Sequence, residues 1–301
     1  MSRAEARSRP KINTRSCWLL AATLFLAPRP AHAQSLPPYD GPTFTPSAEA
    51  QTVIDSLQGR FGTHTVLPST WDLGRERYPL SPASPEVIRT IESAYEHIRP
   101  LVSQLPHMQG ADGTLPSSYP SELRIYTLRG LAGSPGGGYA DNMIQLTIPG
   151  SIDLHALAPI DKDGIRREGT VEDEIAHAAM HEVMHRFTVL NPALYEEYVA
   201  RFWRHNKDGT WTIKDRRNLS GYRGEPTPWE IYADELASVS IPIRDDFDVR
   251  LFGSPYGYRA MSPGMLILLK GHPELRSWAM DRKRSDIFSS LPHIYLPKTS
   301  R

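Results

Sequence analysis

Apolar residues recur at helical spacing in the first third of the chain. From Ser47 onward they fall every third or fourth position, at Ala50, Val53, Ile54 and Leu57, which predicts a helix with one buried face. A stronger pattern follows Ser84-Pro85, a capping residue with proline at the first helical position. Its apolar positions predict a helix packed on the core over residues 85–105: Val87, Ile88, Ile91, Ala94, Tyr95, Ile98, Leu101, Val102 and Leu105.

The pattern then changes to strict alternation. Residues 122–128 (ELRIYTL) and 142–148 (NMIQLTI) alternate apolar and polar side chains, as half-buried strands do. The glycine-rich segment 130–138 separates them. Its GGG run at 136–138 lacks the strand–glycine–helix setting and the following Lys-Ser/Thr of a phosphate-binding loop. We expect this run to be a mobile loop beside a cleft.

Helical patterns dominate the second half. A helix is predicted from Thr170, where Thr170 and Asp173 resemble a capping pair, to Leu190, where Asn191-Pro192 ends it. Further helices are predicted over residues 192–205, 227–240, 265–269 and 273–283. A small sheet followed by a mostly helical half predicts an α+β fold, with one domain over residues 47–301.

The N-terminal residues have the features of a secretory signal peptide. Basic residues precede an apolar run, Cys17–Ala27, and Ala31-His32-Ala33 is a small-x-small cleavage signature. The run is too short to span a bilayer. We therefore expect a signal peptide over residues 1–33, an exported protein (periplasmic or secreted) and no stable membrane insertion after cleavage. Residues 34–46 predict a proline-rich linker or arm, and a regulatory prosegment within 34–83 stays open.

Charge and cysteine content exclude several classes of function. Six of the 34 Lys+Arg and one of the 34 Asp+Glu lie in residues 1–33, so the remainder carries 28 basic and 33 acidic residues, a net charge of −5. A protein with this mildly acidic net charge lacks the excess of basic residues with which proteins bind nucleic acid or anionic lipid. The one cysteine, Cys17, lies within the predicted signal peptide. The exported chain would have neither a disulfide nor a catalytic thiolate.

The segment HAAMHEVMH contains the candidate chemistry. His181 and His185 lie four apart, so on a helix both imidazoles can reach one ion from the same face. Glu182 points off that axis and can hold an activated water without binding the metal. His177 lies a further turn away. We expect it to be a hydrogen-bonded neighbour of the site or a solvated residue.

A catalytic zinc needs a third protein ligand and an open position. Residues 186–191 (RFTVLN) contain neither the glycine nor the third histidine that one zinc motif places there. Downstream, Glu230 and Asp234 share a helix face, so Glu230 can complete the site while Asp234 orients a histidine. Thr227-Pro228-Trp229-Glu230 is also a capping-box pattern. If Glu230 serves as a cap, Asp234 or Glu235 would reach the metal instead.

HEVMH and the later EIYADELA resemble the zincin metallopeptidases whose third ligand is glutamate, the gluzincins. The resemblance covers these two short motifs. It implies Zn²⁺ bound by His181, His185 and Glu230, with Glu182 as general base and a peptide or protein as substrate. It also implies an upstream edge strand that holds an extended peptide by strand addition, for which residues 142–148 are well placed. The transition-state donor of this family is a later Tyr or His, and the candidates are Tyr222, His205, Tyr256 and Tyr258.

Two other functions stay open on the sequence. The first is a non-catalytic exported binding protein in which zinc is absent or is closed off by a fourth ligand such as His205. The second is a zinc amidase acting on peptidoglycan cross-links, which uses the same chemistry on another amide. We expect four aromatic residues to pack in the core or between helices and not to form a carbohydrate platform: Phe202, Trp203, Trp211 and Trp229.

Overall fold

The structure is a computed structural model that describes residues 39–73, 76–104, 119–140, 142–152, 171–214, 227–239, 268 and 271–272. Several sequence predictions lie outside these residues: the signal peptide, the start of the arm, the capping residue Thr170, the helix at 273–283 and nearly all of the helix at 265–269. Residues 39–46 run along the domain, where Thr43 pairs with Pro68 and the amide of Phe44 donates to the carbonyl of Leu67.

The main sheet has the order β1-β5-β7-β6. Its strands are β1 (His64–Val66), β5 (Glu122–Gly133), β7 (Met143–Ile152) and β6 (Gly136–Ala140), and the short β4 (Leu80–Ser81) pairs with β5. The β1, β5 and β7 strands are mutually parallel, whereas β6 runs antiparallel to β7. A separate hairpin joins β2 (Asp72–Leu73) to β3 (Glu76–Arg77).

Two predictions about this sheet are wrong. The GGG run is not a loop, because Gly136, Gly137 and Gly138 pair with Thr147, Leu146 and Gln145 as part of β6. A tight return with Asn142 at φ 69° brings β6 beside β7. The segment predicted at 142–148 is a strand, as expected, but it is not the edge. It lies between β5 and β6, so β6 is the outer strand at this end of the described sheet.

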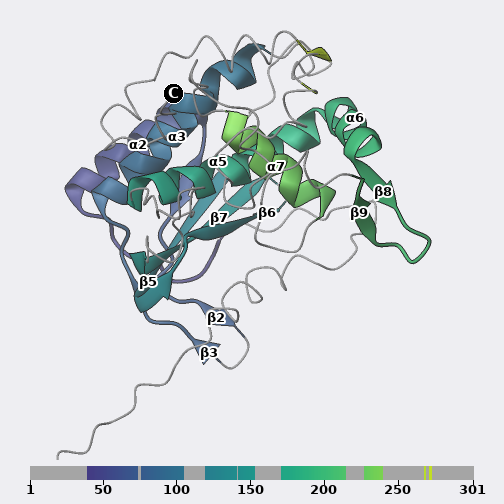
Figure 1. Ribbon diagram of the computed structural model, residues 1–301. Coiled ribbons are helices and arrows are strands. Elements are labelled where there is room, and N and C mark those ends of the chain that lie inside the picture. The colour runs from purple at the N-terminus through teal and green to yellow at the C-terminus, as the bar shows by residue number, and fades with distance from the viewer. Residues whose placement is uncertain are drawn as a thin grey trace, which may run out of the picture.

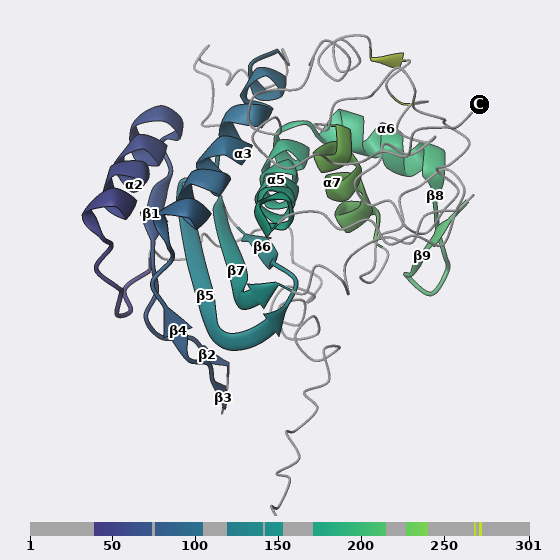
Figure 2. The same ribbon diagram turned by 60° about the vertical axis from the view of Figure 1, so that its left-hand side comes forward.

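Three helices cover one face of the sheet: α2 (Ala48–Phe61), α3 (Pro85–Gln104) and α5 (Val171–Leu190) (Figure 2). The hydroxyl of Ser47 caps α2 by accepting from the amide of Ala50, and Gly62 ends the helix at φ 69°. The apolar faces predicted from the sequence are buried: Leu57, Ile88, Ile91 and Ile98 are all fully inaccessible. Burial of these faces against the sheet is what holds the layers together.

After α5 the chain forms α6 (Pro192–Phe202), then the hairpin of β8 (Trp203–His205) and β9 (Trp211–Ile213). The predicted helix over residues 192–205 is therefore too long. Its last three residues turn extended and pair with Ile213, Thr212 and Trp211. The hairpin turn at Gly209, with φ 84°, permits this pairing. Helical periodicity could not show it, because the pairing partner lies beyond the helix.

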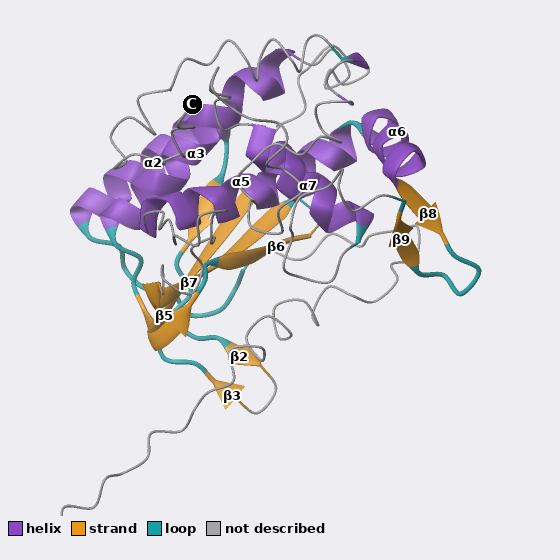
Figure 3. Cartoon of the chain, viewed as in Figure 1, coloured by secondary structure: helices purple, strands orange, loops and turns teal. Residues whose placement is uncertain are grey.

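The last described helix, α7 (Pro228–Val239), packs against α5. Figures 1 and 3 show the two helices side by side above the sheet. Helices and a small mixed sheet confirm the predicted α+β class. No helix among the residues described is long and apolar enough to cross a membrane. The packing of α7 on α5 is what joins the two sequence motifs.

Candidate metal centre

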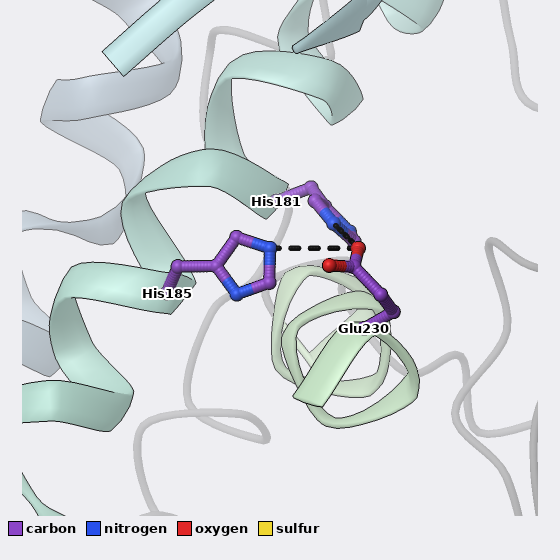
Figure 4. Close-up of side chains that lie close together, drawn as sticks. All are labelled: His181, His185 and Glu230. Atoms are coloured by element: carbon purple, nitrogen blue, oxygen red, sulfur yellow. Dashed lines mark hydrogen bonds and ion pairs between the residues drawn. The ribbon is translucent and has the colours of Figure 1, made fainter. Parts of the chain in front are cut away.

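Two histidines of α5 and one glutamate of α7 converge between these helices (Figure 4). His181 and His185 lie one turn apart on the same face of α5, with ring centroids 4.8 Å apart at 88°. Glu230 stands in the first turn of α7. One carboxylate oxygen of Glu230 lies 3.2 Å from Nε2 of His181 and 3.6 Å from Nε2 of His185.

These distances fit a tetrahedral zinc ion. Two ligand atoms bound at about 2.0–2.1 Å with a tetrahedral angle lie about 3.4 Å apart, which is the spacing that Glu230 makes with each histidine. The three ligand atoms all lie within 4.8 Å of one another. Two imidazoles and one carboxylate also form a ligand set that zinc prefers. In the part of the chain that the structure describes, no fourth His, Asp or Glu joins this group.

Glu230 takes part in the cap of α7 through its backbone, while its side chain has the position of a ligand. Its backbone amide donates to the hydroxyl of Thr227 at 3.3 Å, so Thr227 caps α7 while the Glu230 carboxylate faces the histidines. Glu235, one alternative third ligand, is fully buried and does not belong to the group of potential ligands. Burial and then the charge of Glu235 raise the pKa of Tyr198 from α6.

Asp234, the other alternative third ligand, lies beside His177 and His181 of α5. One of its oxygens is 3.8 Å from Nδ1 of His181 and 3.3 Å from Nε2 of His177. It is therefore placed to orient His181 from the side opposite Glu230. His177 lies outside the group of potential ligands, with its ring centroid 6.5 Å from that of His181.

Glu182 lies between the metal-binding group and the sheet, with one carboxylate oxygen 4.0 Å from Nε2 of His185 and its Cγ and Oε1 beside β6. It is 4% exposed, and one of its carboxylate oxygens has no hydrogen-bond partner among the described residues. The β6 strand passes directly against it at Gly137. A Cβ built on Gly137 would lie 2.7 Å from Cγ and 2.8 Å from Oε1 of Glu182, and 2.7 Å from the carbonyl oxygen of Gln145. This position therefore requires glycine, for reasons of space and not of backbone conformation.

The charges of the site favour a cation at its centre. Burial raises the pKa of Glu182 to about 8, the charge of His181 opposes this shift, and the charge of Glu230 adds to it. Burial alone would lower the pKa of His181, but its hydrogen bonds to Asp234 and Glu230 raise it well above the ordinary value. Burial would raise the pKa of Glu230, yet the two histidines hold it far below its usual range. The carboxylates thus stabilise positive charge where a metal ion would sit.

Of the predicted transition-state donors, the structure describes His205 alone, and it does not place this residue at the three potential ligands. His205 lies on β8 with its ring 4.6 Å from that of Trp211, in a hairpin that projects beyond α6 (Figure 1). Tyr222, Tyr256 and Tyr258 lie outside the described residues. Of the aromatic residues expected to pack in the core or between helices, Phe202 and Trp203 are buried, whereas Trp211 is exposed.

Sequence reasoning missed two neighbours of the site. Trp229 was expected to serve only in packing, but its ring lies parallel to His185, with centroids 4.9 Å apart at 8°. Its position directly before Glu230 was the available signal. Tyr139 of β6 is the other, with its ring 6.3 Å from that of His185. No pattern in the glycine-rich segment pointed to it.

Comparisons with known protein families, with characterised proteins and with solved structures gave no match.

Proposed function

We propose that the protein is an exported zinc metallopeptidase of the gluzincin type, with His181, His185 and Glu230 as ligands and Glu182 as general base. The convergence of Glu230 on both histidines, at 3.2 and 3.6 Å, carries the proposal. His181 and Glu230 lie 49 positions apart in sequence, on two different helices.

When bound, zinc supplies a Lewis acid and lowers the pKa of a water molecule to near neutrality. The surroundings of Glu182 suit a residue that exchanges protons. In the metal-free site burial raises the pKa of Glu182 to about 8, well above the usual range of a carboxyl group, and a raised pKa makes a carboxylate a better proton acceptor. Its place beside the ligands, with one oxygen 4.0 Å from Nε2 of His185, keeps it close to the reacting groups.

The β6 strand supports a peptide substrate. It is the outer strand of the described sheet, it runs antiparallel to β7, and it touches Glu182 through Gly137. An extended peptide that paired with the edge of β6 not covered by any described strand would pass in front of the proposed general base. The substrate strand expected at residues 142–148 is thus reassigned to β6, one strand further out.

The geometry also argues against a closed structural site. A structural zinc takes four protein ligands, and the candidate fourth ligand, His205, lies on β8 with its ring against Trp211. Among the described residues, the three-residue group leaves a fourth position for water and substrate. This openness supports catalysis over a purely structural role.

The test combines metal content with hydrolysis. The protein expressed from residue 34 is assayed for zinc and for cleavage of a protein digest, with purified peptidoglycan in parallel. We expect about one zinc per chain and peptide cleavage in the wild type. Glu182→Gln should keep its zinc and lose roughly 10²–10⁴-fold in rate. The exposed Glu196 serves as control, and Glu196→Gln should match the wild type.

Two outcomes would overturn the proposal. Absence of zinc from the folded wild type would remove the metal site. An active Glu182→Gln variant would remove Glu182 as the base. Cleavage of peptidoglycan alone would keep the chemistry and replace the peptide substrate by a cell-wall amide.

A further inference from the structure

The two histidines of the site are held in different ways. A histidine that binds zinc through Nε2 ordinarily donates its Nδ1–H to a carboxylate or carbonyl, which fixes the orientation of the ring. His181 has Asp234 on that side, at 3.8 Å from Nδ1. His185 has no such partner among the described residues. Its Nδ1 is buried without a hydrogen bond to any of them, while its Nε2 faces Glu230.

An indole occupies the face of the His185 ring instead. Trp229 lies almost parallel to it, with ring centroids 4.9 Å apart at 8°. This arrangement is an offset stack, which restricts both tilting and sideways movement of the imidazole. The His185 side chain is otherwise enclosed, at 2% exposure. Of the two described rings that stack on His185, Trp229 is the closer and the more nearly parallel, since Tyr139 lies 6.3 Å away at 29°.

Trp229 is itself in contact with a residue of α6. Tyr195 packs edge-to-face against the indole, with centroids 5.8 Å apart at 86°. Tyr195 in turn contacts Tyr232 of α7 at 5.4 Å. The row His185, Trp229, Tyr195 and Tyr232 thus links the metal site to the aromatic contact between α6 and α7. The indole cannot rotate freely while that contact is intact.

We propose that Trp229 is a positioning residue of the metal site, whose indole holds the His185 ring with Nε2 toward the ion in place of an Nδ1 hydrogen bond. This inference rests on the proposed function, because it assigns Trp229 to the zinc site. One turn of α7 then provides both a ligand, Glu230, and the support of a second ligand. The packing of α7 on α5 therefore brings the Glu230 ligand and the indole that supports His185 to the site at the same time.

The test measures zinc affinity by competition with a chelator, and cobalt(II) absorption as a report on ligand geometry. We expect Trp229→Leu to bind zinc roughly 10- to 100-fold more weakly than the wild type, as loss of a supporting residue does, and to alter the cobalt spectrum. Trp229→Phe keeps an aromatic face and should stay within about threefold. Trp211→Leu, an exposed tryptophan on β9, is the matched control and should be unchanged.

Thermal unfolding of the metal-free variants separates positioning from folding. Tyr195→Leu leaves Trp229 in place but removes its support, so it should lower zinc affinity by a smaller factor even if Trp229→Leu folds poorly. Wild-type affinity and an unchanged cobalt spectrum in folded Trp229→Leu, or in folded Tyr195→Leu, would overturn the inference alone. A wild-type protein without zinc would overturn the proposed function and, with it, this inference.

Discussion

The contact between Gly137 and Glu182 gives a prediction that needs neither metal nor substrate. Alanine at position 137 would place its Cβ 2.7 Å from Cγ of Glu182, 2.8 Å from Oε1, and 2.7 Å from the carbonyl oxygen of Gln145. Optimal carbon contacts begin at about 3.5 Å, so each approach is roughly 0.7–0.8 Å too close. The Gln145 oxygen belongs to a backbone paired with β6, so it cannot move without disturbing the sheet.

The cost follows from these contacts. Overpacking of a buried site destabilises a protein by about 1–3 kcal/mol. Alanine regains roughly 0.5–1 kcal/mol of the conformational entropy that glycine loses in a strand. The net loss in the free energy of unfolding should be about 0.5–2 kcal/mol. At roughly 2–4 °C per kcal/mol for a domain of this size, Tm should fall by about 1–8 °C.

The assay is urea and thermal unfolding of the metal-free protein. Gly59→Ala is the control, because no atom lies within 4 Å of its built Cβ and alanine favours the helix α2 by about 0.5–1 kcal/mol. A double-mutant cycle adds Glu182→Ala, which removes two of the three close contacts that the new methyl group makes. The cycle should show a coupling of about 0.5 kcal/mol or more. Wild-type stability of Gly137→Ala, or strict additivity with Glu182→Ala, would refute the placement of β6 against Glu182.

Two further predictions concern the charges of the site. Glu230→Ala should abolish stable zinc binding, whereas Asp234→Ala should weaken it by roughly 10- to 100-fold; equal zinc content in the two variants after chelator washing would contradict the assigned roles. The pKa of Glu182 is raised from 4.5 to about 8 by burial, so between these values the folded metal-free chain holds a proton that the unfolded chain releases. Its free energy of unfolding should therefore fall, by an amount on the order of a few kcal/mol, as pH rises from 5 to 8, and Glu182→Gln should remove this component in urea unfolding at pH 5, 6.5 and 8.

The local parts of this protein follow from its sequence. Spacing of three and four predicted α2, α3 and α5, and it placed His181 and His185 on one face of α5 with Glu182 off that face. These features need no partner to be recognised, because they depend on the period of the helix. The class α+β followed from the order of the patterns. The role of Glu182 and the identity of the metal remain predictions from the motif.

Tertiary packing decided the rest. The GGG run carries no hydrophobic pattern, and only its backbone bonds to β7 make it a strand and move the edge outward. Glu230 could cap its helix or face the histidines, and the packing of α7 on α5 directs its carboxylate to His181 and His185. The stack of Trp229 on His185 likewise joins residues 44 positions apart. Contacts of this kind depend on where two elements meet, and periodicity within either element does not contain that information.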